Sequence, residues 1–140
     1  MKIGEWDGIG SSRALIAHQL GELGAQELAA HVSVDADRGR QRILVATDIG
    51  LLDCIWSVNG AGPDATWSLR GGLVRWPSVR GLRLQTDAEW DPATERTRSL
   101  WRLVAEDPRI ELTATQIEPA DHTVGPLLAF ARACLERAGQ

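Results

Sequence analysis

The chain has 140 residues, of which 44% are hydrophobic and 24% are charged, and its formal net charge is −4. These values are ordinary for a soluble globular protein, and one domain is the default for this length. A chain of this size buries roughly 70% of its unfolded surface, so it needs no disulfide or metal to form a core. The net negative charge argues against broad nucleic-acid binding, although it leaves room for a local basic patch.

Three features indicate the compartment. The opening MKIGEWDGIG has no continuous apolar region, so we expect no signal peptide. All apolar runs fall far short of the roughly 20 residues that a membrane-spanning helix needs. Cys54 and Cys134 form no CxxC motif, and we expect two reduced, partly buried thiols, with a bridge between them left open. We therefore expect a cytoplasmic protein.

The first expected element is a helix that begins near Ser11 or Ser12, either of which can cap it, and reaches about Leu23. Gly24 follows and can end it. Its apolar residues recur at helical spacing and form one stripe: Leu15, Ile16, Leu20 and Leu23.

Seven β-rich segments follow, separated by turn-forming residues. Asp48-Ile49-Gly50 is expected to form a tight turn, and Gly71-Gly72 a bulge or bend. Because the connections are of hairpin length, neighbouring strands should be antiparallel. The expected strands are Glu27–Asp35, Arg42–Asp48, Leu51–Val58, Thr66–Trp76, Val79–Trp90, Thr97–Ala105 and Arg109–Glu118.

The fifth of these segments alternates between apolar and polar residues, which places Arg83 in solvent. After it, from about Thr123, apolar residues return to helical spacing, and Pro126 suits the first turn of a closing helix. We expect the inward side chains of the segment to be buried beside that helix: Leu82, Leu84 and Trp90 with Leu128, Ala131 and Leu135.

The pattern predicts a mostly β (α+β) fold with about seven antiparallel strands. Such a sheet protects its edges most simply by curling into a barrel or a split sandwich, and the closing helix can cap its open end. We expect a helical extension over residues 1–26 and a β-barrel domain with its C-terminal helix over residues 27–140.

Seven strands followed by one helix is the order of the pleckstrin-homology (PH) superfold. RILVATDIGLLDCIW, residues 42–56, resembles the second hairpin of bacterial PH-like and GRAM-type domains. LVRWPSVRGLRLQ, residues 73–85, is similar to their next hairpin. The resemblance covers about residues 27 to 139 and implies a binding module for phosphoinositides, peptides or proteins. A fold alone does not determine the function.

Arginines supply the candidate ligand-binding residues. Arg40-Gln41-Arg42 sits where the lipid-binding PH-like domains have basic residues, but the preceding strand offers no lysine, and Asp35 and Asp37 flank the loop. These departures argue against phosphoinositide binding. Residues 65–86 contain four arginines and no acid, whereas residues 87–95 contain four acids and no base. We expect these two blocks to neutralise each other, within the chain or between subunits, rather than form an anion site. The candidate ligand-binding residues are Arg38, Arg40, Arg42, Arg80 and Arg83.

No motif indicates catalysis, a cofactor or a metal. His18, His31 and His122 share no metal-binding spacing, and Gly60-Ala61-Gly62 is not followed by a helix. The six tryptophans are expected to supply core bulk rather than stack on nucleic acid. We expect a non-catalytic binding or assembly module, with a protein or a second copy of the chain as partner. The alternative is a small-ligand carrier or enzyme with a cavity between a curved sheet and the C-terminal helix.

Overall fold

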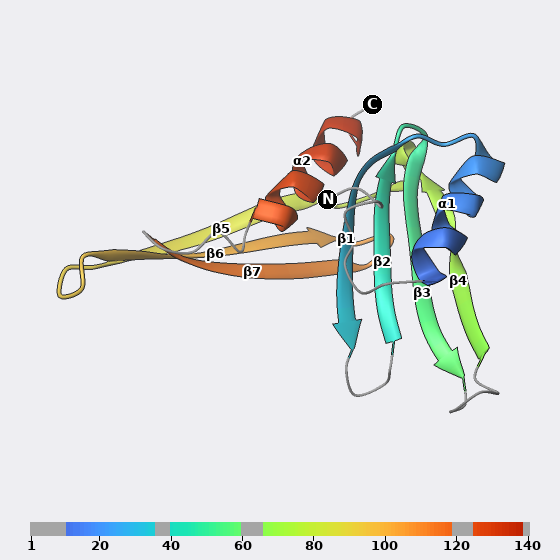
Figure 1. Cartoon of the computed structure of the whole chain (residues 1–140). Coiled ribbons are helices and arrows are strands. Elements are labelled where there is room, and N and C mark those ends of the chain that lie inside the picture. The colour runs from blue at the N-terminus through green and yellow to red at the C-terminus, as the bar shows by residue number, and fades with distance from the viewer. Residues whose placement is uncertain (1–10, 36–39, 60–65, 119–124, 139–140) are drawn as a thin grey trace. The chain divides into compact units, whose positions relative to one another are not determined.

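A computed structural model describes residues 11–35, 40–59, 66–118 and 125–138. The chain divides into two compact units, of which the first ends at Trp76 and the second begins at Pro77. Each unit contains one antiparallel sheet and one helix (Figure 1). The expected mostly β fold, with seven antiparallel strands, an N-terminal helix and a C-terminal helix, is confirmed.

The seven strands are not closed into a barrel. They form a four-stranded sheet and a three-stranded sheet that share no strand pairing among the described residues. Strands four and five are separated by a short 3-10 turn, Trp76–Ser78, where Pro77 lacks the backbone N–H that a continuing ladder would need. The strand count was therefore predictable, but the closure was not.

The first sheet has the order β1-β2-β3-β4. A register shift between Glu27 and Ala29 marks an irregularity in β1. The β3–β4 register is continuous through Gly71, so the bulge expected there is wrong. A side chain at Gly71 would overlap the carbonyl oxygen of Asp53, so a close backbone approach requires glycine at this position. The strands are β1 (Glu27–Asp35), β2 (Arg40–Thr47), β3 (Gly50–Asn59) and β4 (Thr66–Arg75).

Helix α1 (Ser11–Leu23) covers one face of this sheet. Ile16 and Leu20, one turn apart, are buried, whereas Leu15 and Leu23 are exposed. The sequence-based domain division places this helix in an extension, but in the structure its two buried side chains belong to the core of the first unit. That core also contains Ala30, Ile43, Val45, Leu52, Cys54 and Trp56.

The expected turn between β2 and β3 is present. The Thr47 hydroxyl donates to the Gly50 carbonyl (2.7 Å) and accepts from the Gly50 N–H (3.1 Å). The Asp48 carboxylate accepts the Gln26 N–H (2.7 Å), and the Trp76 indole N–H donates to the Thr47 carbonyl (2.9 Å). A buried hydroxyl with these partners fixes where the two strands reverse.

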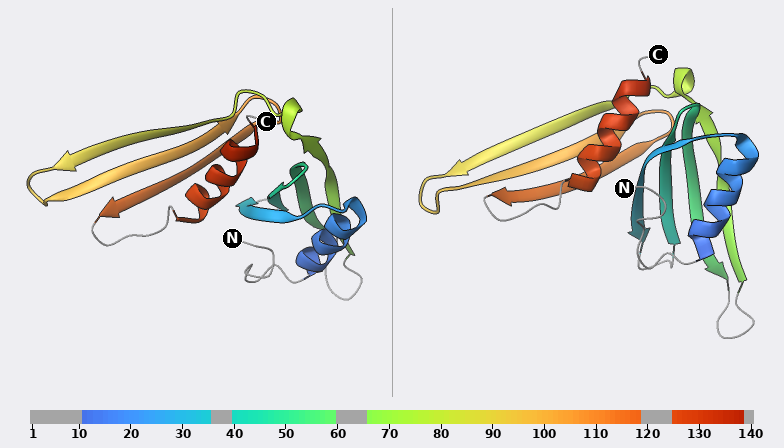
Figure 2. Two further views of the ribbon diagram at one scale, coloured as in Figure 1. Left: turned by 90° about the horizontal axis from the view of Figure 1, so that it is seen from above. Right: turned by 45° about the horizontal axis from the view of Figure 1, so that its top comes forward.

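The second sheet has the order β5-β6-β7 and lies against helix α2 (Gly125–Ala138) (Figure 2). Pro126 occupies the first turn of that helix, as expected. The strands are β5 (Arg83–Asp91), β6 (Arg96–Ala105) and β7 (Ile110–Glu118). Among the residues of this unit that the structure describes, the buried apolar ones are Val79, Leu103, Ala105, Ile110, Leu112, Leu127, Phe130, Ala131 and Cys134.

The core expected around β5 is largely wrong. Ala131 is buried, but Leu82, Leu84 and Leu128 are only half-buried. Trp90 is 60% exposed and Leu135 is 40% exposed. The reason is geometric, because the β5–β6 hairpin extends past the end of α2 and so has no helix over its outer half (Figures 1 and 2). Correct alternation along a strand therefore did not guarantee burial.

Candidate functional site

One face of the second sheet carries charged side chains from both β5 and β6. In β5, Arg83, Asp87 and Glu89 alternate with apolar or neutral residues and are exposed. The β5–β6 register places Glu89 opposite Arg98. Asp91 lies opposite Arg96 in the same way. Opposite charges at facing positions on neighbouring strands stabilise a sheet by roughly 0.2–1 kcal/mol per pair.

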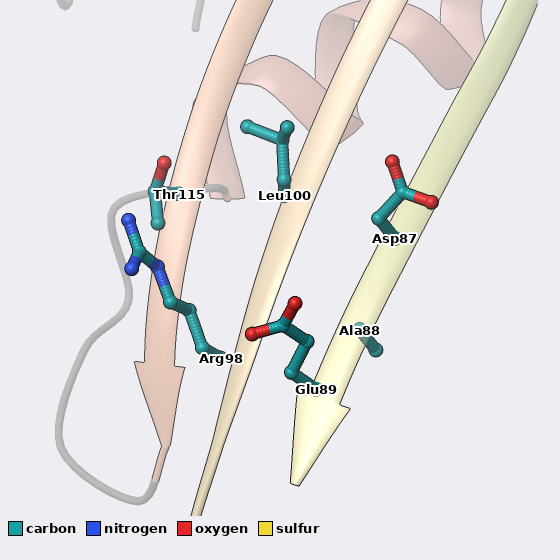
Figure 3. A pocket seen from close by; sticks show the side chains of 6 residues that line it. All are labelled: Asp87, Ala88, Glu89, Arg98, Leu100 and Thr115. Atoms are coloured by element: carbon teal, nitrogen blue, oxygen red, sulfur yellow. The ribbon is translucent and has the colours of Figure 1, made fainter.

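This charged face has an open depression of about 400 Å³ (Figure 3). In the figure, the Arg98 guanidinium reaches toward Thr115 on β7, and the Glu89 carboxylate projects from β5 toward β6. The depression therefore combines two carboxylates and one guanidinium on a rigid sheet, a set that can recognise a polar or charged surface by ion pairing. Its lining residues are Asp87, Ala88, Glu89, Arg98, Leu100 and Thr115.

A second depression, of about 540 Å³, lies at the tip of the hairpin, next to the exposed Trp90. The turn there is held by the Asp91 carboxylate, which accepts the Ala93 N–H (2.9 Å). Glu95 has a φ of 54°, a left-handed conformation that is uncommon for a residue with a side chain. An ordered turn thus holds an aromatic side chain in solvent at the end of the hairpin.

A third depression, of about 430 Å³, lies between α2 and the second sheet. Its apolar residues come from both layers, with Leu84 on β5, Trp101 on β6, and Leu128 and Leu135 on α2. Two charged residues of the helix, Arg132 and Glu136, complete the lining. This groove occupies the place where the sequence-based alternative expects a cavity.

Two of the three arginines expected in the first unit, Arg40 and Arg42, are described by the structure. Arg38 lies outside the described residues. Arg40 is exposed on β2. Arg42 is joined to Asp53 by two hydrogen bonds, from Nε to Oδ1 (3.0 Å) and from Nη2 to Oδ2 (2.8 Å). A guanidinium in this forked geometry already donates two hydrogen bonds to a carboxylate of the same sheet, so fewer of its donors remain for a ligand.

The other two candidate arginines lie in the second unit. The Arg80 N–H donates to the Asp107 carbonyl (2.8 Å), and the Arg80 carbonyl accepts the Glu106 N–H (2.9 Å), so its backbone is bound to an acidic turn. Arg83 is exposed and lies opposite Val104. Of the four expected site residues that the structure describes, two belong to each unit, and none of them lines the three depressions described above.

Sequence reasoning missed Arg96 and Arg98, which face the acidic block. The sequence contained enough information to find them. The strand residues on the two sides of the Pro92-Ala93-Thr94-Glu95 turn pair with each other in order of their distance from the turn. Counting from that turn sets Asp91 against Arg96 and Glu89 against Arg98. The expectation that arginines 80 and 83 neutralise the acidic block stays a prediction for contacts between subunits.

His31 is half-buried and both cysteines are buried. Burial lowers the pKa of His31 from its ordinary value of 6.5. Burial raises the pKa of Cys134 to about 12 and, together with the Asp53 charge, that of Cys54 to about 11. Both thiols are free. A cysteine is a nucleophile as its thiolate, so these two sites favour structural roles.

Two features are absent from the part of the chain that the structure describes. No group of three or more His, Cys, Asp or Glu side chains is arranged to hold a metal ion. No helix is long and apolar enough to cross a membrane. No protein-family model, curated protein or solved structure matches this chain.

Proposed function

We propose that this protein is a non-catalytic binding or assembly module that acts through the β5–β6 hairpin of its second unit. The observation that supports this most strongly is the exposure of β5. In a nine-residue edge strand, all residues except the half-buried Leu84 are exposed, and these include the large aromatic Trp90. An edge strand offers unpaired backbone groups to an added strand, and a projecting tryptophan is a common centre of protein interfaces.

We also propose that the chain is a PH-like domain. The order of four antiparallel strands, three antiparallel strands and a closing helix supports this part of the proposal. It also includes the cytoplasm as the compartment, for which two free, buried thiols are the supporting observation. The paired state of Arg42 favours a protein partner over an anionic lipid or nucleic acid.

Site-specific photo-crosslinking tests this function. A photoreactive amino acid at Thr86, in the middle of β5, should form covalent adducts with a defined protein when cells that contain the full chain are illuminated. The same amino acid at the exposed Thr113 on β7 is the matched control and should not form them. The adducts, identified by mass spectrometry, should be lost with Trp90→Ala. If Thr86 gives only the adducts seen at Thr113, the proposal is rejected.

The groove beneath α2 favours a second candidate, a carrier of a small apolar ligand. Its volume of about 430 Å³ lies within the range of ligand sites, and its floor is apolar. An apolar fluorescent probe should then bind with a defined stoichiometry, and Leu128→Arg should abolish binding while leaving the circular dichroism spectrum unchanged. Weak binding that does not saturate, or that survives this substitution, rejects the carrier.

A further inference from the structure

β5 is an edge strand of the second sheet, and eight of its nine residues are exposed. β5 pairs with β6 on one side, and no described strand pairs with it on the other. Its nine residues have a mixed charge pattern, from Arg83 at the start to Asp87, Glu89 and Asp91 toward the end. A strand whose two ends carry opposite charge can pair antiparallel with another copy of itself.

The charge pattern selects one register for such a pair. With Thr86 on the two-fold axis, Arg83 of each copy faces Glu89 of the other, and Gln85 faces Asp87. Moving the axis to Asp87 sets two like charges against each other. Moving it to Ala88 sets Asp87 against Glu89 twice, and moving it to Gln85 shortens the overlap of the two strands. The axis at Thr86 is therefore the register that combines a long overlap with two ion pairs and no like-charge pair.

The same register covers the exposed tryptophan. On the other face of the strand, Leu84 of each copy faces Ala88 of its partner, and Trp90 falls opposite Leu82, the residue that directly precedes the strand. Trp90 is 60% exposed and Leu82 is half-buried in the single chain, so both would lose apolar surface to water on pairing. The charged face of β5 selects this alignment, and the apolar face is compatible with it.

The facing strand β6 strengthens the charged row. Within one chain Glu89 lies opposite Arg98. In the paired state the Glu89 carboxylate would lie between that guanidinium and Arg83 of the second copy. A carboxylate has two oxygens and can accept from both.

We infer that the protein forms a two-fold symmetric homodimer by antiparallel pairing of β5 with β5 of a second copy, centred on Thr86, so that the two three-stranded sheets become one continuous sheet. This inference rests on the proposed function and names its partner. A strand-to-strand contact is small compared with standard protein interfaces, so the association should be reversible and depend on concentration.

Charge reversal in the full-length chain tests the pairing. Sedimentation velocity over a wide concentration range should show a monomer–dimer equilibrium for the wild type. Arg83→Glu and Glu89→Arg should each raise the dimer Kd about tenfold or more, which is ~1.4 kcal/mol or more. An equimolar mixture of the two variants should dimerise again, because each facing position in the mixed dimer holds one acid and one base.

Two further variants serve as controls for the charge-reversal test. Glu111→Arg makes the same charge change on β7, the opposite edge of the same sheet, and should leave the Kd unchanged. Glu89→Gln avoids placing a cation against Arg98 and should weaken the dimer by a smaller factor. The pairing is rejected if the wild type is monomeric at all concentrations, if mixing restores nothing, or if Glu111→Arg weakens the dimer equally. Photo-crosslinks from Thr86 to a different protein, with a monomeric wild type, would reject self-pairing while leaving the binding module in place.

Discussion

The contact between Arg42 and Asp53 changes the interpretation of the Arg40-Gln41-Arg42 motif. The two residues lie on adjacent strands but not directly opposite, since Arg42 faces Ile55 and Asp53 faces Leu44. Their side chains are 30% and 23% exposed and meet through two hydrogen bonds. Diagonal neighbours on a sheet are within reach of long side chains. The arginine that resembles a ligand-binding residue is thus a structural partner within the first sheet.

A double-mutant cycle tests this residue pair. We expect Asp53→Asn and Arg42→Gln to lower the free energy of unfolding by about 1–3 kcal/mol each, because each leaves a partly buried partner unsatisfied. The coupling energy should be about 1–2 kcal/mol. Arg40→Gln, on the same strand but exposed, should change stability by less than about 0.5 kcal/mol. Urea unfolding provides the measurement, and additive effects of the two substitutions would contradict the pairing.

At the scale of single elements, α1 shows that a helix can be held by a narrow contact. Its two buried side chains, Ile16 and Leu20, lie one turn apart, and their neighbours Leu15 and Leu23 face solvent. An isolated helix of 13 residues is marginal in water, so packing on the first sheet supplies most of its stability.

Ile16→Ala should therefore destabilise the protein by about 2–5 kcal/mol, because the side chain is fully buried and leaves a cavity. Leu15→Ala is the matched control, since it removes an apolar side chain of the same size from the exposed face of the same helix. We expect it to cost less than about 1 kcal/mol. Equal losses in a denaturant titration would show that the helix is not docked on the sheet through Ile16.

The β5–β6 hairpin is the second informative element. Its strand alternation was predictable, but its inner and outer halves have different surroundings. Near α2, Leu84 and Trp101 are half-buried beside the helix, whereas Trp90 at the far end is exposed. Alternation reports which residues share a face of a strand, and the length of the covering helix decides how many of them are buried.

At the scale of the whole molecule, the chain forms two compact units, each with its own sheet, rather than one barrel. Cys54 is buried in the first unit and Cys134 in the second. The pKa of Cys54 is raised to about 11 and that of Cys134 to about 12, so both thiols stay protonated at neutral pH. Each cysteine therefore reports on the integrity of its own unit.

We expect both thiols of the native protein to resist a disulfide reagent at pH 8 and to react fully in denaturant. The reason is that the reactive thiolate is scarce at a raised pKa and each sulfur is buried. Single variants Cys54→Ala and Cys134→Ala assign the remaining signal to one unit. Rapid labelling of either cysteine under native conditions would show that its unit opens readily.

The sequence by itself determined the features that depend on neighbours along the chain. These are the alternation of the strands, the turn at Thr47 to Gly50, the helical spacing of Ile16 and Leu20, and the mostly β class. Such features follow from local backbone geometry and from side-chain period, so a short window contains the necessary information. Even the pairing of Glu89 with Arg98 was readable by counting outward from a four-residue turn.

Tertiary structure alone decided which strands end the sheets and what covers each face. The division into two sheets and the exposure of Trp90 depend on contacts between residues distant in sequence. Many arrangements of the same hairpins satisfy the local patterns, and only the packing of the whole chain chooses among them. The binding edge proposed for β5 comes from that choice, because a strand becomes available to a partner only when its own fold leaves it at an edge.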